Sequence, residues 1–302
     1  MQVAKNLDED HVRYRVAVLL SAHGRSPYLR EQVASIRAAL TPDDILVVVD
    51  DGSAQVDWSS LHGELPHNYL CWSRLKGLGS SLSFMDLLCN LPIRASYYSW
   101  ADQDDRWCKD KLSCQLQWLA TKPDAWACVH GWRPLRLGQD GKWITDAPQA
   151  PTVQRSAAHY CFETPAPGMT LCMTEEARQQ LMALDRQLLK RLLADMPHDR
   201  LACAVLGLSG RLQLVADVLV DYRQHSENLI GAPPSGRLAR ATQRIQRWRS
   251  FWRTARAGGV LYRQLVASGL GSGQALPRLT DQRLRASGGE NWILQAWLRW
   301  YG

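Results

Sequence analysis

The sequence predicts an α/β fold in which a sheet is flanked by helices and followed by a helical extension. Three observations lead to this prediction. Between residues 15 and 129, short apolar or aromatic runs alternate with stretches of helical periodicity, as strands and helices do in such sheets. A run typical of a linker, residues 232–236, then interrupts the chain. The residues after it are rich in tryptophan and arginine, and a helical period returns.

The expected strands and helices follow in chain order. Residues 16–20 and 45–49 are unbroken apolar runs, typical of strands that are buried on both faces. A helix is expected between them, because apolar residues recur there at three- and four-residue steps: Leu29, Val33, Ile36 and Leu40. Residues 95–100 predict a further strand, and the helix after it carries Leu112, Leu116 and Leu119.

The second half of the domain is less regular. Residues 131–167 are rich in proline, glycine and glutamine and have no period, so we expect loops with short strands there. Helical periodicity returns at Thr174, another helix begins near His198, and a strand is expected around residues 212–215. The chain therefore divides into an N-terminal tail, residues 1–14, a domain, residues 15–231, and a helical extension, residues 232–302.

Composition argues against several classes of protein. With 46% hydrophobic and 22% charged residues among 302, the chain is an ordinary globular mixture. It shows no secretory signal, and its longest apolar stretch, residues 201–220, contains Arg211, Gln213 and Asp217, so we expect no membrane crossing. Eight cysteines without a Cys-x-x-Cys pair favour reduced thiols and a cytoplasmic location.

Charge is distributed unevenly along the chain. The residues after the linker begins hold 12 arginines and two acidic residues, whereas those before it sum to −3, within a total of +7. We therefore expect no nucleic-acid partner for the domain, while the extension remains able to bind anions.

Acidic residues follow two of the expected strands. The run 50–53, Asp-Asp-Gly-Ser, comes directly after a buried strand, where such sheets bind ligands and a carboxylate can accept from a nucleobase or a ribose. A plain Asp-Gly turn is the alternative. Asp102, Asp104 and Asp105 follow the strand at 95–100, and their repulsion would be relieved by a divalent cation such as Mg²⁺ or Mn²⁺. A solvated acidic turn is the alternative there.

Two further polar segments carry chemistry. Asp199 opens a helix, where it can act as an N-cap or as a general base toward an acceptor hydroxyl. Arg223 and His225 lie in a dense polar string that suits a diphosphate or a metal. The chain lacks a complete Gly-x-Gly-x-x-Gly, a phosphate-binding Gly-Lys-Ser/Thr loop, a Gly-x-Ser-x-Gly elbow and a His-Glu-x-x-His helix, so redox, kinase and hydrolase functions lose their usual support.

Six motifs in order carry a family resemblance. They are Ser21-Ala22-His23-Gly24 before Tyr28-Leu29-Arg30-Glu31-Gln32, Asp50-Asp51-Gly52-Ser53, Asp102-Gln103-Asp104-Asp105-Arg106-Trp107 with Lys111-Leu112, Pro167-Gly168-Met169-Thr170, His198-Asp199, and Tyr222-Arg223-Gln224-His225 with Asn228 and Gly231. Over residues 15–231 the chain thus resembles glycosyltransferase family 2, especially its bacterial rhamnosyltransferase-like members. This resemblance implies the GT-A fold, with a single Rossmann-like mixed sheet flanked by helices.

The resemblance also implies an activity and roles for residues. The activity is the inverting transfer of a sugar, first of all L-rhamnose from dTDP-L-rhamnose, to a hydroxyl of a glycan or lipid-linked acceptor. Asp199 aligns with the catalytic base, and Asp104 and His225 align with positions that bind Mg²⁺ or Mn²⁺ or close the site over the diphosphate. Donor-binding positions align with Ala22, His23, Asp51, Asp102, Gln103 and Arg223. Among them, Asp51 would face the nucleobase and Asp102 the ribose and diphosphate.

Three positions depart from the family pattern. His23 and Ser81 stand where asparagine is common, and Gly131-Trp132 replaces an acidic or polar pair. Because these positions lie near the nucleotide, the donor sugar or the acceptor, another UDP- or dTDP-sugar is an alternative donor. A non-catalytic sugar- or lipid-binding scaffold is an alternative function, and failure to bind any nucleoside diphosphate with metal would favour it.

The extension is expected to contact a membrane surface. Within residues 237–256, arginines cover much of a helix on which apolar residues recur at three- and four-residue steps: Leu238, Ala241, Ile245, Trp248, Trp252 and Ala255. Such a helix can lie in the headgroup layer of an anionic membrane at its cytoplasmic face. Packing of the same stripe on the domain or on a second subunit is the alternative.

Overall fold

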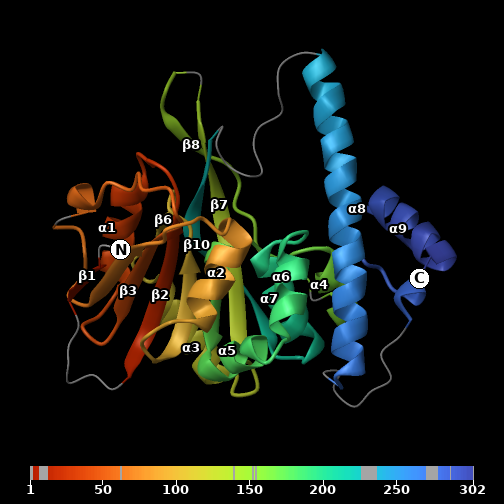
Figure 1. Ribbon diagram of the computed structural model, residues 1–302, viewed down its shortest axis with the longest axis horizontal. Coiled ribbons are helices and arrows are strands. Elements are labelled where there is room, and N and C mark those ends of the chain that lie inside the picture. Colours follow the sequence, from red (N-terminus) through yellow and green to blue (C-terminus); the bar gives the residue numbers. More distant parts are fainter. Residues whose placement is uncertain are drawn as a thin grey trace.

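A computed structural model confirms the expected α/β architecture (Figure 1). It describes residues 3–6, 13–61, 63–138, 140–151, 153, 155–225, 237–269, 278–285 and 287–301. The strands are β1 (Val3–Asn6), β2 (Tyr14–Ala22), β3 (Ile45–Asp50), β4 (Tyr69–Ser73), β5 (Ala95–Ala101), β6 (Arg106–Trp107), β7 (Ala127–Leu137), β8 (Trp143–Thr145), β9 (Leu171–Thr174) and β10 (Leu212–Gln224).

The helices lie between these strands and after them. They are α1 (Leu29–Ala39), α2 (Ser80–Cys89), α3 (Lys111–Thr121), α4 (Ala157–Phe162), α5 (Glu175–Met182), α6 (Arg186–Leu193), α7 (His198–Leu208), α8 (Arg237–Ala267) and α9 (Gly288–Tyr301). Short 3₁₀ turns occur at η1 (Trp58–Leu61), η2 (Gly168–Thr170) and η3 (Leu279–Asp281).

One mixed sheet runs through the domain in the order β1-β4-β3-β2-β5-β9-β7-β10-β6, with β8 paired to β7. Strands β2 to β5 are parallel, and β9 is antiparallel to both β5 and β7, so β7 and β10 point the same way as β5. Their carboxyl ends therefore share one edge, which we call the carboxyl edge. It is the upper edge in Figure 1, where β7 leads into the hairpin with β8.

The sheet is covered on both faces. Alternate residues of β2 enter two different cores, since side chains of a strand point to opposite faces. Ala17 and Leu19 pack with side chains of α2, α5, α6 and α7, whereas Val18 and Leu20 pack with those of α1 and α3. Every residue of β3 is buried, as expected for a central parallel strand.

The structure differs from the expected elements in three places. The region expected as loops holds most of β7 and the helix α4. The strand expected at 212–215 continues to Gln224, because residues 218–224 pair with β7 beyond a register shift after Leu214. Within the segment expected as a tail, β1 adds an antiparallel edge strand to β4. The periodicity of the sequence did not reveal these strands, because residues distant in sequence supply the partners for their backbone hydrogen bonds.

The second half of α8 packs on the domain. Ala255, Leu261 and Leu265 are buried in the same core as α4 and α7. At Gly258 an added Cβ would lie 2.3 Å from the carbonyl oxygen of Cys161, so the backbones of α8 and α4 lie in direct contact. The packing alternative therefore holds for this half of the helix.

The first half of α8 is helical, as expected, but the side chains of residues 237–247 lie outside the described part. The expected apolar stripe can thus be followed only from Trp248 onward. Trp248 is 38% exposed, and Trp252 contacts Trp297 of α9 with ring centroids 5.8 Å apart. None of the helices in the described residues is long and apolar enough to span a bilayer.

Candidate active site

The loops after β2 and β5 are joined at the carboxyl edge. The side-chain oxygen of Gln103 accepts from the backbone N–H of His23 at 3.0 Å, and its amide nitrogen donates to the carbonyl oxygen of His23 at 3.2 Å. Ala22 is buried at the end of β2, and its carbonyl oxygen accepts from the N–H of Asp51 at 2.8 Å. Ala22, His23, Gln103 and Asp51 are thereby neighbours.

The carboxylate of Asp51 is held by the loop after β4. It accepts from the backbone N–H of Leu78 at 3.0 Å, from that of Gly79 at 2.8 Å and from Nη1 of Arg74 at 3.0 Å. Gly52 has φ +73°, and an added Cβ would lie 2.1 Å from the nitrogen of Gly77, so only glycine fits. Asp51 therefore anchors the loop of residues 74–79 against the Asp-Asp-Gly-Ser turn, a role the sequence did not predict.

The acidic run after β5 turns back along β10. The two residues of β6 pair antiparallel with Val220 and Asp221. This turn brings Asp104 to His225, whose Nε2 lies 2.7 Å from Oδ2 of Asp104, and each of these two side chains is 17% exposed. Two residues expected to bind metal are thus in contact although they are far apart in sequence.

The three aspartates of this run have different surroundings. Burial, and then the charges of Asp104 and Asp199, raise the pKa of Asp102 to about 7. Burial raises the pKa of Asp105 well above its usual value, and Oδ1 of Asp105 accepts from the N–H of Arg223 at 3.1 Å. Asp105 is buried and supports the backbone of β10 through this hydrogen bond, whereas the side chains of Asp102 and Asp104 are partly exposed. Since the charge of Asp199 affects Asp102, these two carboxylates lie within electrostatic range.

Asp199 stands in the first turn of α7. The N-cap of this helix is Pro197, and Oδ1 of Asp199 accepts from the N–H of Arg200 at 2.6 Å. The adjacent His198 is buried, stacks on Phe84 with ring centroids 4.3 Å apart, and has a pKa that burial lowers to about 4. Asp199 therefore does not occupy the N-cap position, and a neutral, packed histidine fixes the start of its helix.

Turn η2 packs closely against the start of α7. An added Cβ at Gly168 would lie 2.8 Å from Nε2 of His198 and 3.5 Å from Cβ of Asp199. Gln115 fixes the same turn from the other side, because its amide nitrogen donates to the carbonyl oxygen of Thr170 at 2.9 Å. The absence of a side chain at Gly168 thus determines how closely Asp199 approaches the turn.

Arg223 is enclosed by aromatic rings. Its guanidinium lies 4.3 Å from the ring centroid of Tyr28 and 4.9 Å from that of Trp143, and Nη2 donates to Glu31 at 2.7 Å. The ring of His225 lies 5.2 Å from that of Tyr28. Such stacking of a guanidinium between rings is favourable when it is desolvated. Arg223 is 1% exposed, so it links β10, α1 and the β7–β8 hairpin besides any contact with a diphosphate.

The side chains near Asp104 suit a divalent cation in their chemistry. Carboxylate oxygens and an imidazole nitrogen are ligands that Mn²⁺ accepts, and the oxygens also suit Mg²⁺. A cation would relieve the repulsion that helps to raise the pKa of Asp102. Among the described residues no group of three or more His, Cys, Asp or Glu side chains is arranged to hold a metal without further ligands. A diphosphate would have to complete the coordination.

Comparison with known proteins places this geometry in a structural class. No family model and no curated protein matches the sequence. The S. aureus TarS 1-349 structure in complex with UDP has a TM-score of 0.53, 14% sequence identity, and coverage of 82% of this chain and 65% of that chain. Its complex with UDP-GlcNAc has a TM-score of 0.50 and 14% sequence identity, and the match covers 82% of this chain and 66% of that chain. The mannosyltransferase PcManGT from Pyrobaculum calidifontis, in complex with GDP-Man and Mn²⁺, has a TM-score of 0.48 and 18% sequence identity. This match covers 95% of this chain and 85% of that chain.

The chain has a GT-A-like fold. The expected architecture is therefore confirmed by the sheet and by its similarity to TarS. The chain spans 60% to 66% of the length of the TarS 1-349 structures that it matches.

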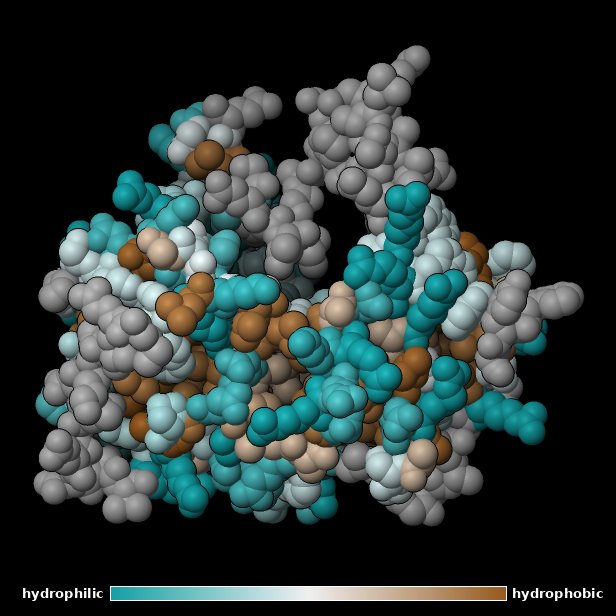
Figure 2. All heavy atoms as spheres, viewed as in Figure 1, coloured by the Kyte–Doolittle hydropathy of each residue, from teal (hydrophilic) through white to brown (hydrophobic). Residues whose placement is uncertain are grey.

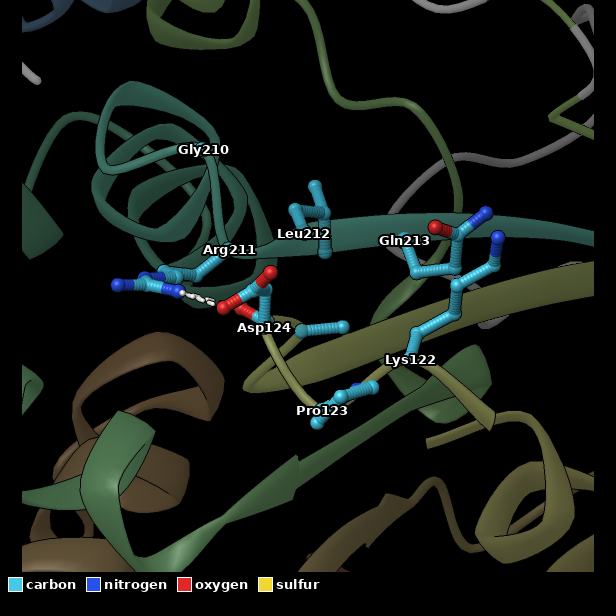
Figure 3. Close-up of a pocket in the computed structure, with 8 residues that line it drawn as sticks. Lys122, Pro123, Asp124, Gly210, Arg211, Leu212 and Gln213 are labelled. Atoms are coloured by element: carbon cyan, nitrogen blue, oxygen red, sulfur yellow. Dashed lines mark hydrogen bonds and ion pairs between the residues drawn. The ribbon is translucent and has the colours of Figure 1, made fainter. Parts of the chain in front are cut away.

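A pocket lies at the opposite edge of the sheet, before β7 and β10 begin. Its volume is about 170 Å³. Figure 3 shows Arg211 reaching Asp124 beside it, at 3.3 Å, and Lys122 and Gln213 on the other side. None of the candidate site residues lines this pocket.

Sequence reasoning missed the side chains that surround the candidate residues. Trp143 stacks on Arg223 although it lies in a region without any period, and Tyr28 was noted only as part of a motif. Arg74 was not singled out, yet it binds both Asp51 and Asp86. A single aromatic residue in a Gly- and Pro-rich stretch was the available signal for Trp143, and it does not reveal a partner.

Proposed function

We propose that this chain is an inverting glycosyltransferase of the family 2 type. It would move a sugar from a nucleoside diphosphate to a hydroxyl of a glycan or lipid-linked acceptor in the cytoplasm, at the inner face of a membrane. The contact of Asp104 with His225 at the carboxyl edge carries this proposal, together with Asp102 and Asp199, which lie within electrostatic range of each other. It is supported by the fold shared with TarS, which was solved with UDP and UDP-GlcNAc. The first donor to test is dTDP-L-rhamnose, and a UDP-sugar is the alternative.

The proposed reaction is a single displacement. Asp199 takes the proton of the acceptor hydroxyl while the acceptor oxygen forms its bond to the anomeric carbon. The bond from that carbon to the diphosphate oxygen breaks on the opposite side, which inverts the anomeric centre. Asp104 and His225 would hold Mg²⁺ or Mn²⁺, which supplies positive charge to the leaving diphosphate. Asp102 would hold the ribose and diphosphate in line.

Substitution of Asp199 tests the proposed base. Asp199→Asn should lower kcat by ~10² to 10⁴-fold, because the amide cannot take the proton. The dissociation constant for the donor and the melting temperature should stay near those of the wild type, since Pro197 is the N-cap. Near-normal turnover would exclude Asp199 as the base, and a collapse of the melting temperature would show a structural role instead.

Two neighbouring aspartates give a matched test of the metal site. Asp104→Asn should remove metal-dependent nucleotide binding, because it weakens a ligand that His225 contacts. Asp105→Asn should leave that binding unchanged, because Asp105 is buried and its pKa is raised. Calorimetric titration with nucleoside diphosphate, in Mn²⁺ and in chelator, measures both. Equal binding by the Asp104 variant and the wild type would contradict the assignment.

The identity of the donor can be tested with a panel of nucleotide sugars. A ligand that binds the native state stabilises it by ~2.7 kcal/mol when the ligand concentration is about a hundred times the dissociation constant. This stabilisation raises the melting temperature. Thermal shifts with dTDP-rhamnose, UDP-sugars and GDP-mannose, each with and without Mn²⁺, should single out one nucleotide. If none of them shifts the melting temperature, the proposal of a donor-binding enzyme fails and a scaffold function replaces it.

A further inference from the structure

Two projections rise from the carboxyl edge. In Figure 1 the hairpin of β7 and β8 and the first half of α8 extend beyond the rest of the described structure on the side of the carboxyl ends. The hairpin continues β7 out of the sheet, and α8 is held to the domain only along its second half in the described contacts. The candidate site residues after β2, β3 and β5 lie on the same edge.

The described part of both projections exposes apolar side chains. In the hairpin, Leu137 is 55% exposed and Ile144 is 39% exposed, and they lie on opposite faces of the two-stranded ribbon. Figure 2 shows a hydrophobic residue among hydrophilic ones on this projection. On α8, Trp248 is 38% exposed. Leu75, 94% exposed, lies in the loop that leaves β4 at the same edge. Single exposed apolar residues are ordinary, but these four lie on the hairpin, on α8 and on the loop after β4.

The charge of α8 specifies the kind of surface that fits. Arginines fall at positions 237, 240, 244 and 247 of its first three turns, and Asp281 is the first acidic residue after the helix begins. Farther along, Arg253 pairs with Asp195 at 2.6 Å and is thus neutralised by the domain. In the hairpin turn the charges of Asp140 and Lys142 cancel. Apolar tips beside a cationic helix match the boundary between the headgroups and the acyl chains of an anionic bilayer.

We propose that the carboxyl edge faces an anionic lipid bilayer and contacts it through these two projections. The active site at this edge then opens toward the membrane, and the acceptor is carried by a lipid. This statement about the acceptor rests on the proposed function, whereas the membrane contact does not depend on it.

Binding of the full chain to vesicles tests the orientation. Vesicles of phosphatidylcholine alone should bind weakly, and vesicles that also contain phosphatidylglycerol should bind in a salt-sensitive way. The double variant Leu137→Ser/Ile144→Ser and the double variant Arg244→Gln/Arg247→Gln should each weaken binding to phosphatidylglycerol vesicles by about tenfold or more. Melting temperatures establish that the variants are folded.

Two control variants distinguish the proposed orientation from orientations in which another surface contacts the bilayer. Val266 is 41% exposed at the opposite end of α8, and Trp292 of α9 is 72% exposed. Val266→Ser and Trp292→Ser should bind vesicles as the wild type does. Loss of binding in Trp292→Ser together with retention in the hairpin variant would overturn the proposed edge. Binding that does not depend on the phosphatidylglycerol content of the vesicles would contradict the electrostatic contact.

Activity separates this inference from the proposed function. The hairpin variant should keep wild-type turnover with a water-soluble acceptor analogue, because it leaves the candidate catalytic residues unchanged. A chain that transfers sugar to a soluble acceptor but binds no vesicle contradicts the membrane contact alone. A chain that binds vesicles as expected but transfers no sugar contradicts the proposed function alone.

Discussion

The closest packing around the proposed base gives the sharpest test of the site. Gly168→Ala adds one methyl group, which would lie 2.8 Å from Nε2 of His198. The ring of His198 cannot move aside freely, because it stacks on Phe84 at 4.3 Å and meets the edge of Trp100 at 4.7 Å. Overpacking of this kind costs about 1–3 kcal/mol. The strain is relieved if the start of α7 moves away from the turn, and Asp199 moves with it.

The expected result is a larger loss in turnover than in stability. A displacement of a catalytic group by ~1 Å can reduce a rate by ~10²-fold, so kcat of Gly168→Ala should fall by about that factor. The melting temperature should fall by ~2–4 °C for each kcal/mol of strain. The dissociation constant for the donor should change little. Steady-state transfer kinetics and thermal unfolding of the same preparation measure these quantities.

A control and two outcomes define the test. Gly259→Ala, in α8, places its Cβ in open space and should keep wild-type turnover and stability or gain slightly in stability, because alanine favours a helix. Wild-type kcat and melting temperature in Gly168→Ala would refute the packing argument. A lowered melting temperature with unchanged kcat would refute the role of Asp199.

Three further predictions concern packing and charge. Burial lowers the pKa of His198 to about 4, so the neutral ring is favoured in the folded chain. Its contribution to the free energy of unfolding is complete above about pH 6.5, and up to ~3 kcal/mol is lost as pH falls toward 4. In denaturant unfolding across that pH range, His198→Asn should lack this pH-dependent contribution. Gly258→Ala should destabilise the chain by more than ~1 kcal/mol in the same assay while Gly259→Ala does not, since only the first Cβ meets α4; equal stabilities would contradict the docking of α8. Arg223→Lys should lower the melting temperature by a few degrees, because an ammonium cannot stack between two rings and also reach Glu31, and an unchanged value would show that the stack contributes nothing.

Much of the fold was accessible from local patterns. The strands at 16–20 and 45–49 lie within β2 and β3, because unbroken apolar runs mark strands covered on both faces, and the run expected at 95–100 lies within β5. By contrast, β10 was predicted at a third of its length, since the exposed residues Ala216 and Asp217 interrupt its apolar residues. Pairing with β7 decides that segment, and no period within it reveals the partner.

The candidate site shows the same division. The acidic run after β5 and the polar string around His225 were recognisable as chemistry-bearing segments, because charged residues directly after a buried strand mark the ligand edge of such a sheet. Their contact was not deducible from spacing, since 121 positions separate Asp104 from His225. Similarly, Asp51 was expected to face a nucleobase, while the structure engages its carboxylate with Arg74 and the loop after β4.

The sequence by itself therefore determined the strands β2, β3 and β5, the strand ends that carry acids, and the position at which the arginine-rich composition begins. These are local properties, set by periodicity, burial and composition within a few residues. Only the tertiary structure decided that β6 folds back to bring Asp104 to His225, that Trp143 encloses Arg223, and that half of α8 packs on α4. Each of these depends on contacts between distant segments, whose free energy is set by the whole packed sheet and is not encoded in any single stretch of the chain.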